Sequence, residues 1–178
     1  MRHVVGVMIV LGLVPAQAAG DDWPGWRGAS RQGVSSDTGL PLRWSATENV
    51  AWKTAIPGDG WSSPIVWGDH VIVTAVHDGG ASYHVVAFDR ASGRLLWDTE
   101  VFRQAPGAKD ETASSAATPA ADGQRVYAVF PGGVAAVTFR GEIAWTNRDH
   151  PFHVCGSSPI LYQDMLKCCE LPCLADWH

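Results

Sequence analysis

Cysteine is absent from the first 154 residues of this chain. A small secreted domain held by disulfides distributes its cysteines along the sequence, so such a framework is excluded for most of the chain. The four cysteines that are present lie near the end, and their pairing stays open: Cys155, Cys168, Cys169 and Cys173. Basic runs are also missing. Because 13 Lys and Arg stand against 18 Asp and Glu, giving a net charge of −5, we expect no nucleic-acid partner.

Long apolar runs are missing after residue 14. The apolar run at Val4–Val14 follows Arg2 and precedes Ala16-Gln17-Ala18, which is the three-part pattern of a secretory signal peptide. The run is too short for a stable membrane-spanning helix. We therefore expect residues 1–19 to be a signal peptide cleaved near Ala18. The mature chain would be periplasmic or extracellular, with no transmembrane anchor.

Helical periodicity of useful length is missing from the remaining sequence, whereas one phrase occurs three times. Gly60–Asp69 returns as Cys155–Asp164, and Ser115–Asp122 is a weaker copy between them. The prolines of the three copies are 55 and 40 residues apart: Pro64, Pro119 and Pro159. Repetition at this spacing predicts a repeat architecture.

A second phrase alternates with the first. Ala87–Trp97 reads as strand, tight turn and strand, and Val137–Trp145 is the same unit with a shorter turn. Glu48–Lys53 looks like the last strand of such a unit. The tryptophans that end the three copies are 45 and 48 residues apart: Trp52, Trp97 and Trp145. We expect these indoles to occupy equivalent, largely buried positions between neighbouring sheets.

Short segments rich in Val, Ile and aromatic residues predict the strands. The expected strands are Ser63–Trp67, His70–Val76, Tyr83–Asp89 and Leu95–Val101, then Thr118–Ala121, Arg125–Val129, Val134–Phe139 and Ile143–Asn147, with Ser158–Tyr162 opening a third set. Asp89 and Gly93 should flank the turn between the third and fourth strands. Four short strands per 40–50 residues, roughly, is the size of one propeller blade. The sequence therefore predicts an all-β fold, a partial β-propeller of four-stranded antiparallel blades. The polar, aperiodic stretch Arg103–Ser114 is interpreted as an inserted loop.

Candidate chemical groups are few. His70, His77 and His84 are seven residues apart, which matches no compact metal motif, so we interpret them as residues of strand ends and turns. His150, His153 and Cys155 offer metal ligands on one loop, but no fourth ligand is evident. The serines before the repeat prolines are assigned to hydrogen bonding within the blade. We assign no catalytic residue and no metal ligand.

Several phrases resemble the opening of PQQ-like β-propeller repeat proteins: Asp22–Gly28, Gly39–Pro41, Trp44-Ser45, Asn49–Lys53 and Trp61–Pro64. That superfamily has an eight-bladed form shared by quinoprotein alcohol dehydrogenases and the outer-membrane assembly factor BamB. The resemblance covers residues 21–166 or so and implies two to three blades of a ring whose remaining blades are missing. We divide the chain into an N-terminal extended segment (20–47), blades (48–166) and a divergent tail (167–178). The tail carries Cys and Pro where a strand is expected, and we hypothesise that it is non-native.

Two functions follow as expectations. The first is a non-catalytic propeller module that binds protein or carbohydrate outside the cytoplasm. The second is the N-terminal part of a PQQ-dependent alcohol or sugar dehydrogenase. The resemblance implies PQQ, a catalytic Asp and calcium held by Glu and Asn for such enzymes, often with a disulfide between adjacent cysteines. Cys168 and Cys169 are adjacent, but they lie where a strand is expected, and no functional residue of the family is transferred. The cofactor and the enzymatic status stay open.

Overall fold

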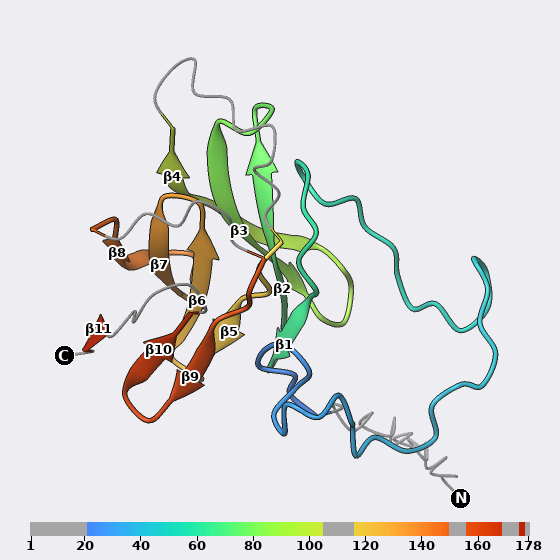
Figure 1. Ribbon diagram of the computed structural model, residues 1–178. Helices are drawn as coiled ribbons and strands as arrows, with labels where there is room; N and C mark the ends of the chain where they lie inside the picture. Colours follow the sequence, from blue (N-terminus) through green and yellow to red (C-terminus); the bar gives the residue numbers. More distant parts are fainter. Residues whose placement is uncertain (1–20, 105–115, 150–155, 169–174, 177–178) are drawn as a thin grey trace, which may run out of the picture.

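The computed structural model describes residues 21–104, 116–149, 156–168 and 175–176. Within these ranges the regular secondary structure is β-strand throughout (Figure 1). The strands are β1 (Ile65–Trp67), β2 (His70–His77), β3 (Ser82–Asp89), β4 (Leu95–Arg103), β5 (Ala120–Ala121), β6 (Arg125–Phe130), β7 (Gly133–Thr138), β8 (Ile143–Asn147), β9 (Ile160–Tyr162), β10 (Met165–Lys167) and β11 (Ala175–Asp176). In the described part of the chain, no helix is long and apolar enough to cross a membrane.

The strands form two four-stranded antiparallel sheets and one smaller sheet. Blade 1 has the order β1-β2-β3-β4, and blade 2 has the order β5-β6-β7-β8. The third sheet, with the order β11-β10-β9, begins with the same hairpin as the two blades. Each blade is thus a meander in chain order, which confirms the predicted all-β fold of four-stranded antiparallel blades.

The expected strand at Glu48–Lys53 is wrong. Of these residues only Glu48 takes part in β-structure, in an isolated bridge to Ser45. A strand needs a neighbour to form its ladder of backbone hydrogen bonds. In the described residues no preceding blade offers this segment such a neighbour, although its tryptophan still packs against blade 1, as shown below.

Two hydrophobic cores join the three sheets face to face. The first lies between blades 1 and 2 and includes Ile72, Tyr83 and Val85 from one and Val126 and Phe130 from the other. The second joins the opposite face of blade 2 to the third sheet, with Leu166 buried against Val129 and Ala136. Alternate residues of each strand therefore serve successive interfaces.

Several expectations lie outside the described residues. They are the signal peptide, most of the inserted loop, the group formed by His150, His153 and Cys155, and most of the divergent tail.

Candidate functional site

Trp97 connects blade 1 to the last turn of blade 2. Its Nε1 donates a hydrogen bond to the carbonyl of Phe139 at 3.0 Å, and Thr99 Oγ1 donates to the carbonyl of Gly141 at 2.7 Å. Gly141 has a φ of 83°, and a Cβ added there would lie 2.8 Å from Trp97 Cγ. Glycine is therefore required where the indole packs against the turn.

Trp52 makes the same contacts with blade 1. Its Nε1 donates to the carbonyl of Arg90 at 2.8 Å, and Thr54 Oγ1 donates to the carbonyl of Gly93 at 2.7 Å. A Cβ on Gly93, whose φ is 69°, would lie 2.4 Å from the Trp52 ring. Trp52 and Trp97 thus occupy equivalent places in two successive steps of the repeat.

Asp89 and Gly93 lie at the two ends of the turn between β3 and β4. The N–H of Gly93 donates to the carbonyl of Asp89, and the N–H of Ser92 donates to the Asp89 carboxylate, each at 2.8 Å. Hydrogen bonds from the Ser92 side chain and then from its backbone lower the pKa of Asp89.

Trp145, in the third copy, packs against the Tyr127 ring at 6.2 Å between centroids. All three repeat tryptophans stay partly exposed.

The residues before the repeat prolines form a series of hydrogen bonds across the sheets. The N–H of Ser63 donates to Thr118 Oγ1 at 3.0 Å, and the N–H of Thr118 donates to Ser158 Oγ at 3.1 Å. Within blade 1, the N–H of Thr74 donates to Ser62 Oγ at 3.1 Å. Pro64, Pro119 and Pro159 therefore follow residues that link neighbouring sheets. The prediction that these serines form hydrogen bonds within a blade is correct for Ser62. The hydrogen bond between Thr118 and Ser158, which joins two sheets, was not predicted.

Residues 21–33 form an N-terminal loop that contacts all three sheets. Trp23 exchanges two backbone hydrogen bonds with Val66 of β1, at 2.8 and 3.0 Å. The carbonyl of Pro24 accepts from the N–H of Ala121 in β5 at 2.8 Å. Arg31 Nη2 donates to the carbonyl of Leu161 in β9. The loop thus lies along the first strand of each successive sheet.

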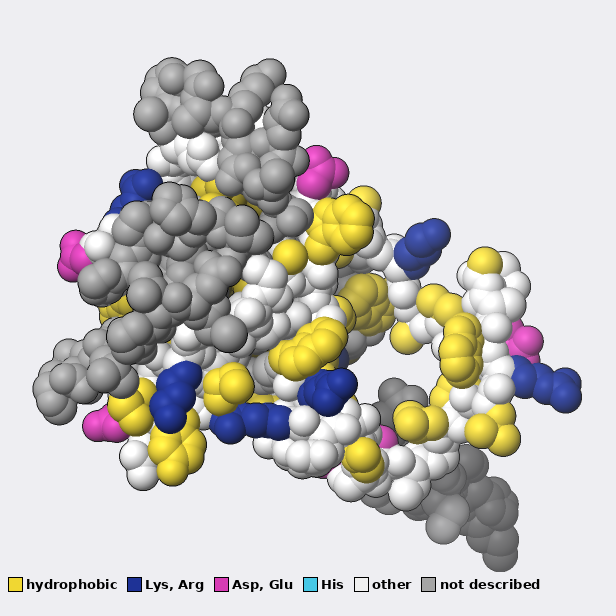
Figure 2. Space-filling model, viewed as in Figure 1, with side chains coloured by type: hydrophobic (Ala, Val, Ile, Leu, Met, Phe, Trp, Pro, Cys, Tyr) yellow, Lys and Arg dark blue, Asp and Glu magenta, His cyan; other side chains and the backbone are white. Residues whose placement is uncertain are grey.

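A pocket of about 680 Å³ lies between the N-terminal loop and the starts of the three sheets. It is lined by Pro24, Gly25, Trp26, Arg27, Gly28, Ala29, Arg31, Trp61, Ser63, Ala116, Thr118, Ala120, Ala121, Gly156, Ser157, Ser158, Pro159, Ile160 and Leu161. Figure 2 shows basic and hydrophobic side chains next to each other around the loop that Figure 1 draws in blue below β1. The three repeated segments that contain Pro64, Pro119 and Pro159 therefore meet the N-terminal segment Asp22–Gly28 at one site.

The pocket is basic and aromatic. The basic residues Arg27 and Arg31 line it together with Ser63, Ser157 and Ser158, whereas Thr118, also in the lining, is only 2% exposed. Trp26 and Trp61 are 53% and 80% exposed and present flat apolar faces. The lining residues given above include no Asp, Glu or Asn, so they do not fit the carboxylate and amide oxygens that calcium requires. The chemistry available here is binding of anionic and hydroxyl-bearing groups.

Two of the three spaced histidines lie together. His77 and His84 stack at 3.7 Å between ring centroids, whereas the His70 ring packs edge-on against Phe139. Asp98, which sequence reasoning did not single out, lies beside the stacked pair. Their assignment to strand ends is correct for His77 but not for His84, which lies inside β3.

Most of the chain matches one known protein family. The family model described as outer membrane protein assembly factor BamB matches residues 24–149. The chain belongs to this family of PQQ-like β-propeller repeat proteins. The match begins in the N-terminal loop and includes all of blades 1 and 2. No curated protein matches the chain.

Three solved structures are similar to this chain, and the first of them shares its fold. A quinohemoprotein alcohol dehydrogenase from Pseudomonas putida HK5 is 18% identical, with a TM-score of 0.54 over 82% of this chain and 22% of its own. BamB from Moraxella catarrhalis is 21% identical, with a TM-score of 0.46 over 65% and 32% of the two chains. A europium-containing methanol dehydrogenase is 15% identical, with a TM-score of 0.49 over 66% and 21%. This chain therefore spans a third or less of the length of each.

Proposed function

We propose that this chain is a non-catalytic binding module that acts outside the cytoplasm through the pocket beneath its N-terminal loop. The observation that carries the proposal is the lining of that pocket. It combines two guanidinium groups, several hydroxyls and two exposed indoles with no carboxylate among its lining residues. General acid–base catalysis needs a titratable group within reach of the substrate, and this lining supplies none that titrates near neutral pH.

A carbohydrate that carries carboxylate groups matches this lining best. Guanidinium groups bind carboxylates through paired, charge-assisted hydrogen bonds. Exposed indole faces bury the apolar C–H faces of sugar rings, and serine hydroxyls in the pocket wall add further polar contacts. Arg31 is held by its bond to Leu161, so one of the two guanidinium groups is positioned before a ligand arrives.

The location outside the cytoplasm is proposed from the signal-peptide pattern in residues 1–19. Mass spectrometry of the protein expressed with its own N-terminus in a bacterial host tests this point. We expect the mature chain to begin just after Ala18 or Ala19 and to be released by osmotic shock. A cytoplasmic chain that still begins with Met1 would contradict the location.

Titration calorimetry with oligogalacturonate, with a neutral glucan of the same length as the reference, tests the ligand class. We expect binding of the acidic oligomer alone, weakened more than about tenfold by Arg27→Gln or by Trp61→Ala. Arg94→Gln and Trp44→Ala change the same residue types outside the pocket lining and should bind as the parent does. Equal binding of both oligomers, or equal loss in all four variants, would contradict the proposal.

A protein partner and an enzyme are the competing outcomes. Capture of a periplasmic protein that depends on Trp61, without any binding of oligogalacturonate, would replace the carbohydrate by a protein ligand. Dye-linked alcohol oxidation after addition of PQQ and Ca²⁺ would show that the chain acts as part of a dehydrogenase. We expect no turnover in that assay.

A further inference from the structure

We propose that His77, His84 and Asp98 of blade 1 form a binding site for a divalent transition metal ion of the Zn²⁺ class. The site is separate from the pocket, since none of the three residues lines it. It is formed by three adjacent strands, with His77 at the end of β2, His84 in β3 and Asp98 in β4.

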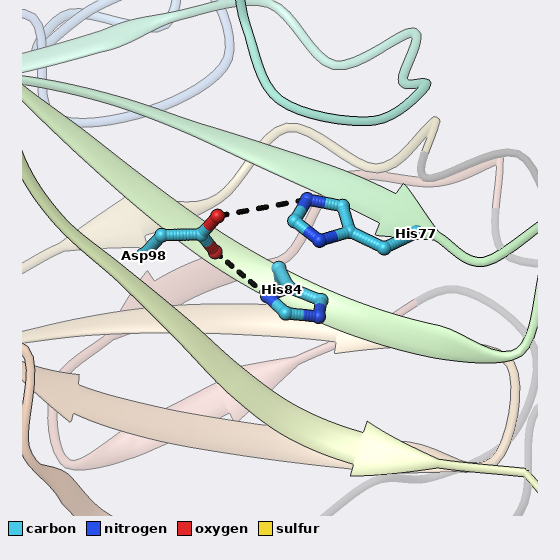
Figure 3. Close-up of side chains that lie close together, drawn as sticks. All are labelled: His77, His84 and Asp98. Atoms are coloured by element: carbon cyan, nitrogen blue, oxygen red, sulfur yellow. Dashed lines mark hydrogen bonds and ion pairs between the residues drawn. The ribbon is translucent and has the colours of Figure 1, made fainter.

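The three side chains lie close together. Figure 3 shows the Asp98 carboxylate facing both imidazole rings, with one oxygen directed at each. His84 Nδ1 is 2.6 Å from Asp98 Oδ1, and His77 Nε2 is 3.7 Å from Asp98 Oδ2. One ligand atom from each residue lies within 4.8 Å of the other two. A tetrahedral Zn²⁺ with bonds near 2 Å needs ligand atoms about 3.4 Å apart, so modest side-chain rotations bring them into range.

Neighbouring groups orient both imidazole rings. Ser82 Oγ lies 3.0 Å from His84 Nε2 and can donate or accept, so the ring can present a lone pair at Nδ1. His77 Nε2, the nitrogen that lies 3.7 Å from Asp98, also donates a hydrogen bond to the carbonyl of Pro57 at 3.1 Å, so it can bind a metal ion only after it gives up this bond and its proton. A Cβ on Gly58 would lie 2.2 Å from His77 Cδ2, so the backbone of this segment packs directly on the ring. Both imidazoles are thus oriented by contacts from outside the cluster.

The cluster is shielded but reachable. The side chains of His84, His77 and Asp98 are 10%, 21% and 22% exposed. Partial burial keeps water from competing fully for the ligands, while the open side admits an ion and a water molecule as fourth ligand. Glu100 Oε2 lies 3.8 Å from His84 Nε2, but its charge is balanced by the Arg103 guanidinium, which bonds to both of its oxygens.

Blade 2 shows that the repeat does not require these residues. The residue after the tryptophan of the fourth strand is Asp98 in blade 1 and Thr146 in blade 2. This tryptophan pairs with an alanine of the third strand. The residue three positions before that alanine is His84 in blade 1 and Gly133 in blade 2. His77 belongs to a hairpin extension with no counterpart, because the β2–β3 ladder has eight residue pairs and the β6–β7 ladder has six. The cluster is therefore an addition to one blade.

Two imidazoles and one carboxylate favour Zn²⁺, Cu²⁺, Ni²⁺ or Co²⁺ over Ca²⁺ and Mg²⁺, which prefer oxygen ligands alone. Three protein ligands leave one tetrahedral position open. Co²⁺ is a suitable probe, because its visible absorption reports both the coordination geometry and the ligand type.

Titration of the full mature chain with Co²⁺ and then Zn²⁺ tests the site. We expect tetrahedral Co²⁺ absorption without thiolate charge-transfer bands, displacement of Co²⁺ by Zn²⁺, and affinity lowered more than about tenfold in His77→Gln and Asp98→Asn. His70→Gln lies on the same strand and should keep the parental affinity. Circular dichroism of the metal-free variants checks that each folds.

A second variant separates this site from the other potential ligands. His150→Gln combined with Cys155→Ser, Cys168→Ser, Cys169→Ser and Cys173→Ser should leave the visible absorption and the affinity unchanged. Thiolate bands in the parent spectrum, or equal affinity in the parent, His77→Gln and Asp98→Asn, would overturn the proposal. If His84→Gln fails to fold, the other two variants still decide the question.

Discussion

Blades 1 and 2 have the same strand order but differ at one end. In both, the fourth strand carries a tryptophan opposite an alanine of the third, as Ala87↔Trp97 and Ala136↔Trp145, and both ladders shift register next to that pair. At the other end of the sheet, the hairpin of blade 1 is longer and carries the histidine cluster, whereas blade 2 closes at Phe130 and Gly133. The end that docks onto the next blade is therefore constrained by packing, and the opposite end is free to acquire new groups.

Removal of the Trp97 indole, which joins blade 1 to blade 2, should have the largest effect on stability. Trp97→Ala deletes a ring that packs against the first core and bonds to Phe139, and we expect a loss of about 3 kcal/mol in unfolding free energy. Denaturant unfolding followed by circular dichroism measures it. Trp44→Ala, at a ring that is 73% exposed, should cost less than about 0.5 kcal/mol. A cost below about 1 kcal/mol for Trp97→Ala would mean that the docking does not hold the blades together.

A methyl group at the docking turn should have the next largest effect. Gly141→Ala places a Cβ against Trp97 and imposes a positive φ on alanine, and we expect a cost of about 2 kcal/mol. Gly39 also has a positive φ of 72° but has nothing within 4 Å of an added Cβ. Gly39→Ala therefore measures the backbone strain alone. Equal costs in the two variants would remove the steric part of the argument.

A carboxylate specific to blade 2 should give the smallest effect. Three residues after the repeat proline stands Trp67 in blade 1 and Asp122 in blade 2. Burial acts to raise the pKa of Asp122, but hydrogen bonds from the Tyr127 hydroxyl and from the N–H groups of Arg125 and Gln124 outweigh it, so this pKa is lowered. Burial, followed by the bond to Asp122, raises the pKa of Tyr127 to about 12.

The sign of the resulting pH dependence follows from linkage. A carboxylate whose pKa is lower in the folded state stabilises the fold above its unfolded pKa of about 3.9, and this contribution is lost as the pH falls through the folded value. We expect Asp122→Asn to destabilise the chain by less than about 1 kcal/mol at pH 7, with the difference shrinking below pH ~4. Urea unfolding at pH 7 and pH 3 measures it. A difference that grows on acidification would contradict the assignment.

The repeat made the sheets predictable. The spacing of tryptophans and prolines, together with Gly-containing turns, placed both four-stranded blades with bounds that differ from the structure by a few residues. β4 is an example, since it was expected at Leu95–Val101 and runs to Arg103. Local pattern sufficed because each blade is a meander whose strands pair with their neighbours in sequence.

The two candidate sites were not predictable in the same way. The pocket exists because residues 21–33 lie along the starts of three sheets, and no periodicity reports such a contact. The histidine cluster depends on which residues of the neighbouring strands pair with each other. The pairing of β3 with β4 shifts register between Tyr83 and His84, and moving this register by one residue would separate the side chains of the cluster. Asp98 and His77 are 21 residues apart, so their meeting could not be read from spacing.

Exchange of the indole N–H protons tests the docking of successive blades most directly. NMR of the folded chain should show the Nε1–H of Trp52 and Trp97 exchanging at least about tenfold more slowly than those of Trp44 and Trp61, because only the first pair bonds to a turn carbonyl of the blade it contacts. Equal exchange of all four protons would contradict the account.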